Sequence, residues 1–335
     1  MRSARGLFVV LVACHSASTQ SPTTNQGSWS DAIALSQPRF EGYAASDGAR
    51  VLMIGGIIGE NGDFSTAEPT ARVDMLAQGA SAWTPGPALP AESAKHHLAV
   101  AVVEDRVFVL GGFDGIIGRQ IPGEAFVPRA TTFVLRNGAW SRLRDQPLAR
   151  GAATAQALGR KIHVVGGAPN EGVAPYAQHF VYDVDADTWE ERRALPTARE
   201  HLASCVLDGK MLVVGGWVGP DDIASTAAEL YDPVSDTWEK VPPLPSRRGG
   251  LGAVTFNGAC HVIGGEDWKV GLPGTTPVHE VFDLAQRTWT TAAALPEARH
   301  GIGVVITGEQ IMVVGGGPVR GNSYTSRVDV FTKAP

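Results

Sequence analysis

Short apolar runs recur along this chain of 335 residues, and a pair of glycines follows them. Clear examples are residues 107–110, 211–214 and 311–314. A continuous apolar run of this length, bounded by glycine, is typical of a β-strand buried on both faces. The glycines provide backbone freedom and leave room for a neighbouring sheet. The pattern predicts an all-β protein, and no amphipathic helical stretch stands out.

The glycine pairs occur six times, about 50 residues apart, which is the period of a four-stranded repeat. A tryptophan follows each of the first five pairs roughly half a period later. The sixth repeat lacks this tryptophan and stops one strand early, whereas Trp29 precedes the first repeat in the equivalent position. We therefore predict that a strand around Trp29 completes the sixth unit and protects an otherwise open edge.

Composition adds three constraints. The 40 glycines and 22 prolines require many turns between short strands, in a chain whose 44% hydrophobic content is ordinary for a globular protein. Because repeats override chain length as a guide to domain number, we predict one folded domain. The net charge of −6 argues against a nucleic-acid partner, because phosphate binding requires a basic surface.

The first residues differ from the rest of the chain. Arg2 and Arg5 precede a short apolar stretch, residues 7–13, which is too short to span a bilayer and is typical of a secretion signal. The stretch ends in Leu-Val-Ala followed by Cys14, which resembles the bacterial lipoprotein box. Cys14 is therefore a predicted lipidation site. An ordinary secretory peptide with an incidental cysteine is the alternative.

These features divide the chain into three parts. We expect a signal peptide at residues 1–13, a flexible tether rich in Ser, Thr, Gln and Asn at 14–28, and the folded domain at 29–335. The predicted location is the cell envelope, with a lipid anchor on the outer-membrane or periplasmic side, or the extracellular space. The membrane is expected to be contacted only through this lipid.

Two further cysteines, Cys205 and Cys260, fall inside strand patterns of neighbouring repeats. The favoured interpretation is a pair of buried thiols that act as small hydrophobic side chains. An oxidising compartment also permits a disulfide, which the sequence leaves open.

In repeats three to five the third strand runs into a short hairpin, as from Tyr182 and Asp183 to Trp189. The aspartate is placed to cap the turn. The double glycine, the aromatic-Asp pair and the tryptophan at this spacing resemble the kelch repeat, over about residues 29–333. The resemblance implies a six-bladed kelch-type β-propeller whose last blade is closed by the N-terminal strand.

A cation precedes the first strand of every repeat. One interpretation is a positive ring that binds carboxylates or phosphates through forked hydrogen bonds. The other is that each cation bonds carbonyl groups of its own or the next blade. Arginines at this position in kelch proteins that bind acidic peptides can do both. The six residues are Arg39, Lys95, Arg150, Arg199, Arg248 and Arg299.

Directly after these cations the repeats diverge, and divergence within a repeat is where specificity can be encoded. Carboxylates and imidazoles gathered at a channel mouth are a candidate general acid/base set or a weak metal site. No close sequence spacing supports a metal, so no metal and no cofactor are expected. The candidate ligand-binding residues here are Glu41, His97, Glu200, His201 and His300, beside His96.

Long polar segments join the second and third strands of each repeat, and on a propeller such loops lie on one face and commonly bind ligands. Trp217 and Trp268 are the favoured aromatic contacts, with anchoring of the loops as the alternative. His163 and His261 share one strand position and are predicted to pack between blades.

The favoured function is a monomeric, envelope-anchored binding module for a protein, peptide or glycan, which is acidic if the cations take part. The alternative is a carbohydrate-active enzyme, similar to periplasmic sialic-acid mutarotases or, with less support, to galactose oxidase. The oxidase chemistry requires a cysteine beside a metal-ligand tyrosine, whereas both remaining cysteines lie within strands. Likeness of fold does not decide between a binding module and an enzyme.

Overall fold

The structure is a computed structural model that describes residues 27–61, 63–115, 126–170, 173–219, 221, 223–269, 271 and 273–334. The predicted signal peptide and lipidation site, Cys14, lie outside these residues. Among the described residues, no helix is long and apolar enough to cross a membrane.

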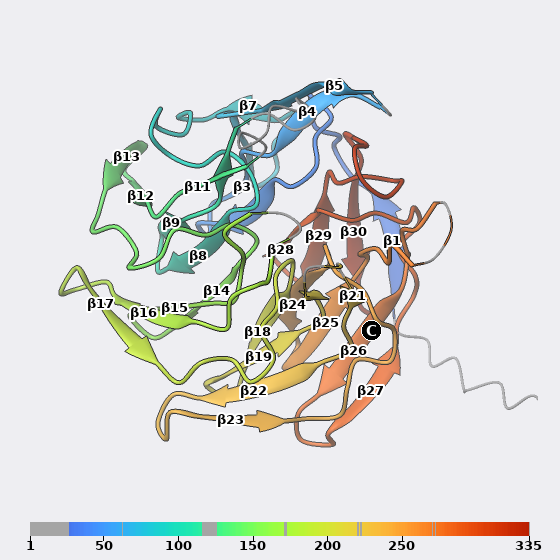
Figure 1. Ribbon diagram of the computed structural model, residues 1–335. Helices are drawn as coiled ribbons and strands as arrows, with labels where there is room; N and C mark the ends of the chain where they lie inside the picture. The colour runs from blue at the N-terminus through green and yellow to red at the C-terminus, as the bar shows by residue number, and fades with distance from the viewer. Residues whose placement is uncertain are drawn as a thin grey trace, which may run out of the picture.

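Six four-stranded antiparallel sheets surround a central axis, which confirms the predicted six-bladed β-propeller (Figure 1). From the axis outward, blade 1 contains β2 (Tyr43–Ser46), β3 (Arg50–Ile54), β6 (Val73–Ala77) and β7 (Thr84–Pro85). Blade 2 contains β8 (Ala99–Val103), β9 (Arg106–Leu110), β12 (Thr132–Arg136) and β13 (Ala139–Arg142). Blade 3 contains β14 (Thr154–Leu158), β15 (Lys161–Val165), β16 (His179–Asp183) and β17 (Thr188–Arg192).

The second half of the ring repeats this order. Blade 4 contains β18 (Ala203–Leu207), β19 (Lys210–Val214), β22 (Ala228–Asp232) and β23 (Thr237–Lys240). Blade 5 contains β24 (Gly252–Phe256), β25 (Ala259–Ile263), β26 (His279–Asp283) and β27 (Thr288–Thr291). Blade 6 contains β28 (Gly303–Thr307), β29 (Gln310–Val314), β30 (Val328–Thr332) and, outermost, β1 (Ser28–Asp31).

The N-terminal strand closes the last blade, as predicted. Strand β1 pairs antiparallel with β30, with Trp29 opposite Phe331. The Trp29 indole lies 5.2 Å from the Phe331 ring, and its Nε1 donates to the carbonyl oxygen of Ala293 in blade 5. The two ends of the folded domain therefore share one sheet, which covers an edge that would otherwise be open.

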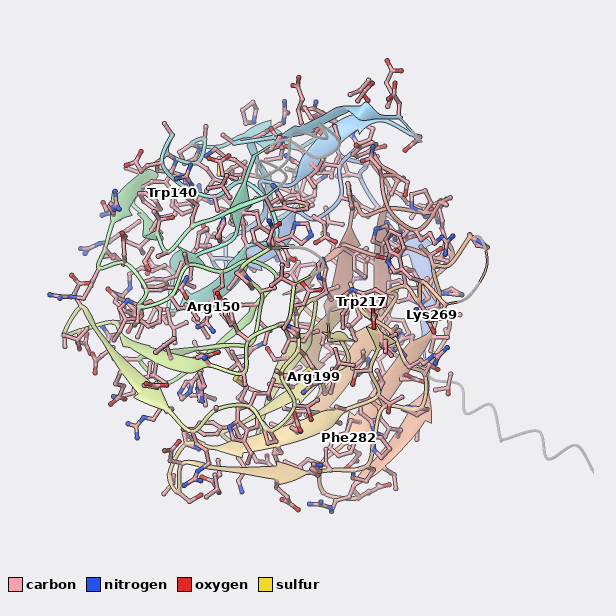
Figure 2. All side chains as sticks on the ribbon, viewed as in Figure 1. Trp140, Arg150, Arg199, Trp217, Lys269 and Phe282 are labelled. Carbon is pink, nitrogen blue, oxygen red and sulfur yellow. A yellow bond between two sulfur atoms is a disulfide. The ribbon has the colours of Figure 1, made fainter. Side chains whose placement is uncertain are left out.

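The recurring tryptophans join neighbouring blades. Trp140 lies toward the outer rim (Figure 2), and its Nε1 donates to the carbonyl oxygen of Pro87 in the preceding blade, 2.8 Å away. Trp189 and Trp238 make the same contact with Arg144 and Arg193. An indole supplies both a large apolar surface and one hydrogen-bond donor. It therefore packs in the apolar interface between two blades and bonds one backbone carbonyl of the neighbouring blade.

The glycine pairs permit the close approach of the blade linkers. The second strands that precede them are buried, as in Met211, Leu212 and Val213, none of which has measurable exposure. Gly166 has a φ of 71°, and a Cβ there would lie only 2.5 Å from the carbonyl oxygen of Arg199. Glycine is required at this point because of both its conformation and its lack of a side chain.

A disulfide links blades 4 and 5. Cys205 of β18 and Cys260 of β25 are bonded, with their Cα atoms 5.7 Å apart. The favoured interpretation as two free buried thiols was therefore wrong. The two strands pack against each other across the blade boundary, which brings the two sulfur atoms together.

Histidine pairs lie at the junctions on either side of that disulfide. His163 bonds His179 within blade 3, and His261 bonds His279 within blade 5. His163 and His261 are 3% and 7% exposed. The first pair packs on Tyr231 of blade 4 and the second on Phe331 of blade 6, which confirms that these histidines pack between blades.

Three small hairpins extend from one face of the propeller, on segments that join second and third strands. They pair β4 (Ile57–Glu60) with β5 (Asp63–Pro69), β10 (Phe113–Asp114) with β11 (Val127–Pro128), and β20 (Trp217–Val218) with β21 (Ile223–Ala224). We call this side the loop face, because all six second-to-third-strand segments and all blade linkers lie on it.

Candidate functional site

The five recurring arginines are buried within the blades. Each is at most 1% exposed, and Figure 2 shows Arg150 and Arg199 inside the ring of sheets. Arg199 donates to the carbonyl oxygens of Gly215 and Ala227 and forms an ion pair of 2.7 Å with Glu229. Arg150 donates to the carbonyl oxygens of Gly166, Gln178 and Val164 and to the side-chain oxygen of Gln146, and burial lowers its pKa to about 9.

The other cations follow the same plan. Arg39 pairs with Asp74, Arg248 with Glu280 and Arg299 with Asp329, all nearly inaccessible to solvent. Lys95 bonds the carbonyl oxygen of Ala91, 3.1 Å away, and that of Ser93. The interpretation that each cation bonds its own or the next blade is the one observed. Ligand recognition by this set gains no support from such burial.

Two residues beyond each cation, the linkers form a closed ring of hydrogen bonds around the axis. Each backbone N–H donates to the carbonyl oxygen of the residue in the preceding blade, over 2.8 to 3.4 Å. All six residues have φ between 50° and 59°, the left-handed region that turns each N–H and C=O toward its neighbours in the ring. The members of this axial ring are Glu41, His97, Ala152, His201, Gly250 and Gly301.

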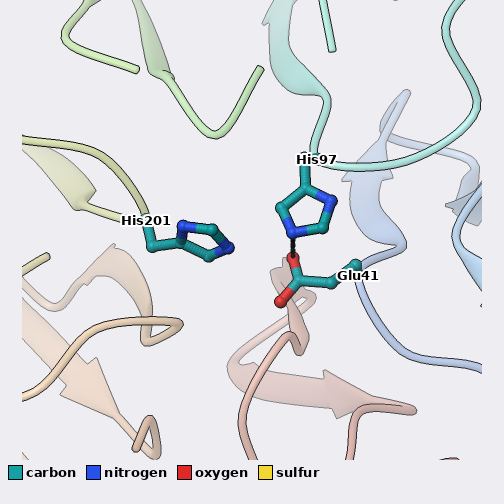
Figure 3. Close-up of side chains that lie close together, drawn as sticks. All are labelled: Glu41, His97 and His201. Carbon is teal, nitrogen blue, oxygen red and sulfur yellow. Dashed lines mark ion pairs between the residues drawn. The ribbon is translucent and has the colours of Figure 1, made fainter. Parts of the chain in front are cut away.

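Three side chains of the axial ring converge on the axis (Figure 3). One ligand atom from each of Glu41, His97 and His201 lies within 4.8 Å of the other two. His97 Nε2 lies 3.6 Å from Glu41 Oε2, and the imidazole rings of His97 and His201 are 4.7 Å apart. The ring brings these residues together from blades 1, 2 and 4, although up to 160 residues separate them in the sequence.

Each of the three side chains also has an orienting partner. Tyr43 donates from its hydroxyl to Glu41 Oε2 at 3.2 Å. Glu200 Oε2 lies 2.9 Å from Nδ1 of His201. These partners fix the orientation of the Glu41 carboxylate and of the His201 ring.

His97 is held from behind by another imidazole. Its Nδ1 lies 2.6 Å from Nδ1 of His96, and one of the two nitrogens must carry the proton. His96 is itself fully buried, and its Nε2 has no hydrogen-bond partner among the described residues. The contact leaves Nε2 of His97 directed toward Glu41.

Burial favours the neutral forms of this cluster. It raises the pKa of Glu41, an effect that the nearby His201 and His300 oppose. It lowers the pKa of His97 well below its usual range and that of His96 to about 3, with His201 lowering both further. The pKa of the Tyr43 hydroxyl is raised well above its ordinary value by burial and by Glu41.

The remaining predicted site residues lie around this cluster. His300 is buried, with Nδ1 3.0 Å from the Gly317 carbonyl oxygen and Nε2 3.7 Å from Glu266. Trp217 is 3% exposed, and its ring fills the space beside Gly249 of the next blade, so it anchors a loop. Trp268 is 46% exposed and lies apart from the axis, under the guanidinium of Arg320 at 5.6 Å.

Two cavities follow the axis. A small one of about 20 Å³ lies at the cluster, lined by Glu41, Tyr43, Ala152, His201 and Gly301 among others. It has room for about one water molecule. A cavity of about 450 Å³ continues along the innermost strands of all six blades and is lined mainly by small apolar residues. The cluster therefore lies where the loop face meets the channel.

Comparison with known proteins agrees with this architecture. A family model described as the KLHDC2/KLHL20/DRC7 Kelch-repeats domain matches residues 41–265. The chain belongs to the kelch-repeat family. A solved structure titled "Structure of YjhT" superposes on this kelch propeller with a TM-score of 0.72 at 14% sequence identity, and it covers 90% of this chain and 99% of that chain. No curated protein matches the chain.

Sequence reasoning missed three parts of the site. Tyr43 and Glu266 were not among the candidates, and the axial ring itself was not foreseen. The signal that points to the ring is the glycine two residues after the cation in the last two full linkers, at Gly250 and Gly301. Glycine at that place indicates a left-handed backbone, which all six linkers then share.

Proposed function

We propose that this kelch propeller is a binding module whose loop face holds a protein or peptide ligand. The observation that supports it is the placement of exposed apolar side chains. Of the six large hydrophobic residues exposed in the described part of the chain, five lie on the second-to-third-strand loops of blades 2 to 6. They are Val127, Val173, Ile223, Trp268 and Val319, and the sixth, Val234, lies on a turn at the opposite face.

Apolar residues scattered singly over a surface need no explanation, but one in each of five consecutive loops surrounds the axis on a single face. Trp268 and Arg320 belong to the residue types that contribute most to protein interfaces, and Arg320 holds the indole in place through its bond to the Trp268 carbonyl oxygen at 2.9 Å. Membership in the kelch family also supports binding as the function.

The test is a selection of peptides that bind the purified protein, followed by affinity measurements with matched variants. We expect Ile223→Ser combined with Trp268→Ser to weaken the selected peptides at least tenfold, because both changes remove apolar surface from the loop face. Val234→Ser, at a residue 95% exposed on the other face, is the control and should leave the affinity unchanged. Equal affinity for all three proteins would place the binding surface elsewhere.

We also propose that the protein is exported and held at the cell envelope by a lipid on Cys14. The disulfide between Cys205 and Cys260 supports export, because such bonds persist mainly in oxidising compartments. After expression in a bacterial host, the protein should sediment with membranes and Cys14→Ser should be released into the soluble fraction. An N-terminal peptide without acyl mass in the native protein would contradict the anchor.

A carbohydrate-active enzyme remains the second candidate, and one observation favours it. Glu41, His97, His201 and Tyr43 form a compact set of groups able to exchange protons at the channel mouth. The cavity there is far smaller than a sugar, so a substrate would have to open it. The direct measurement is the rate at which acidic sugars interconvert between anomers; a rate equal to that of buffer would remove this candidate.

A further inference from the structure

We propose that Glu41, His97 and His201 bind a divalent transition-metal ion of the Zn²⁺ class on the propeller axis. The three donors come from three blades and point toward one another (Figure 3), with their ligand atoms within 4.8 Å. Donor atoms around a tetrahedral Zn²⁺ lie about 3.4 Å apart, as follows from bonds of about 2.1 Å. Nε2 of His97 and Oε2 of Glu41, at 3.6 Å, are already close to this separation.

The orienting partners are those of a metal site. In metal centres, a ligating histidine commonly donates its second ring N–H to a carboxylate, a backbone carbonyl or a water, which directs the first nitrogen at the ion. Here Glu200 bonds Nδ1 of His201 and His96 bonds Nδ1 of His97. These contacts engage Nδ1 of both histidines, and Nε2 of His97 lies 3.6 Å from Glu41, whose carboxylate also accepts a hydrogen bond from Tyr43.

The surrounding charges favour a cation. Glu41, Glu200 and Glu266 are each at most 4% exposed, and among the described residues each forms its ion pair with a histidine rather than with arginine or lysine. The recurring arginines pair instead with other carboxylates or with carbonyl groups, deeper in the blades. Buried carboxylates are stable when paired or bound to a metal, and a dication at the axis provides such a partner.

The space and the donor set define the class of ion. A cavity of about 20 Å³ beside the cluster is lined by Glu41 and His201, but not by His97, and has room for one ion. The ring members Ala152, Gly250 and Gly301 also line it and bring no metal-binding side chain. Three protein ligands with an open position for water are typical of a catalytic rather than a structural Zn²⁺ site. Two imidazoles and one carboxylate favour Zn²⁺, Co²⁺ or a similar ion over Ca²⁺ and Mg²⁺, which prefer oxygen ligands.

The test uses the purified protein without a histidine tag, treated with chelator and titrated with Zn²⁺ by calorimetry. We expect one Zn²⁺ per chain and no comparable binding of Ca²⁺ or Mg²⁺. His201→Asn and Glu41→Gln should each weaken Zn²⁺ at least 100-fold. Glu200→Gln, which removes only an orienting partner, should weaken it about 10- to 100-fold. Glu104→Gln, at an exposed carboxylate between β8 and β9, is the matched control and should retain Zn²⁺ affinity.

A second measurement guards against variants that fail to fold. X-ray absorption of the wild-type protein loaded with one equivalent of Zn²⁺ should show a first shell with two imidazoles. A shell without histidine, the absence of stoichiometric binding, or a His201→Asn protein that keeps its melting temperature and its full Zn²⁺ affinity would each overturn the proposal. These results are independent of peptide binding to the loop face, so either proposal can fail alone.

Discussion

Two positions in the same blade linker differ in what they do. The cation that opens each linker repeats around the ring and bonds the backbone or a carboxylate of the blade, and the five arginines among these cations are buried. Two residues later, the side chains are Glu, His, Ala, His, Gly and Gly, and three of them converge on the axis. The backbone of the second position repeats as closely as the side chain of the first, since all six residues have the same left-handed conformation.

The comparison shows that side chains which repeat in the blades stabilise the propeller, whereas side chains that differ between blades form the candidate site. A contact that every blade needs is supplied by the same residue type in every blade, as the arginines and the interblade tryptophans illustrate. A residue that faces the shared axis meets its counterparts from other blades, so six identical side chains would crowd one another. At the axial-ring position the repeat therefore keeps one backbone conformation but allows the side chain to vary.

The largest expected effect comes from removing a repeated cation. Arg199→Ala leaves Glu229 buried without its ion-pair partner and removes the arginine hydrogen bond to the Gly215 carbonyl oxygen. Breaking a buried pair in this way costs about 3–5 kcal/mol, measured as the free energy of unfolding in urea. Arg142→Ala, at an exposed pair with Asp145, is the control and should change stability little. Equal effects of the two changes would contradict a scaffold role for the buried arginine.

The Cys205–Cys260 disulfide does not recur at other blade junctions, and we expect it to stabilise the propeller without affecting the candidate site. Replacing Cys205 and Cys260 by serine opens a loop of 55 residues and should lower the free energy of unfolding by about 2–4 kcal/mol. Zn²⁺ affinity should stay within twofold of wild type, because neither cysteine lies at the axis. A stable variant that had lost its Zn²⁺ affinity would show that the blade 4–5 junction positions the site.

The interblade histidine pairs predict a pH dependence of stability. Burial is the main cause that lowers the pKa of His163 and His261 to about 4 and that of His179 and His279 to about 3. Because the unfolded chain binds these protons near pH 6.5, it gains protons first as the pH falls. The histidine pairs therefore contribute their full stabilisation above about pH 6.5, and the free energy of unfolding decreases as the pH falls toward 4.

The free energy of unfolding should change with pH by up to about 1.4 kcal/mol per pH unit for each histidine that titrates independently. Urea unfolding between pH 7.5 and 4.5 measures it, above the range in which most carboxylates titrate. His163→Phe with His261→Phe removes two of the four groups and should reduce the slope. An unfolding free energy that stays constant over this range would contradict the buried neutral pairs.

The smallest expected effect is a difference in Zn²⁺ affinity between alanine variants at two glycines of the axial ring. Gly250 and Gly301 have similar φ values, so alanine at either place carries a similar backbone strain of about 1–2 kcal/mol. A Cβ at Gly301 would lie 2.5 Å from Glu41 Oε1, whereas one at Gly250 meets no atom closer than 3.4 Å. Gly301→Ala should therefore weaken Zn²⁺ severalfold, and Gly250→Ala should not. Matched affinities would place the carboxylate elsewhere when the ion is bound.

The sequence predicts the blades better than the site, for a physical reason. Strand patterns, glycine pairs and tryptophans report interactions that occur within one repeat or between adjacent repeats, so blade number and closure by Trp29 follow from them. The disulfide was left open because Cys205 and Cys260 occupy different strands of neighbouring blades, and the strand pattern does not show which of them face each other.

The candidate residues Glu41, His97, Glu200 and His201 were identified from divergence alone, and the structure brings them together. Their convergence depends on the left-handed backbone at Glu41, His97 and His201, where residues other than glycine are uncommon. The local sequence around those residues does not indicate that conformation. The roles of Tyr43 and His96 in orienting the donors depend in turn on the positions of the rings that they contact.

The axial ring also determines how the electric field at the channel mouth arises. Its six hydrogen bonds run head to tail in one rotational sense, so their dipoles lie tangentially and their vector sum around the circle is close to zero. A helix terminus, by contrast, adds its peptide dipoles along one direction. The backbone here thus imposes no preference for a cation or an anion, and the polarity of the opening is set by the side chains on and beside the ring.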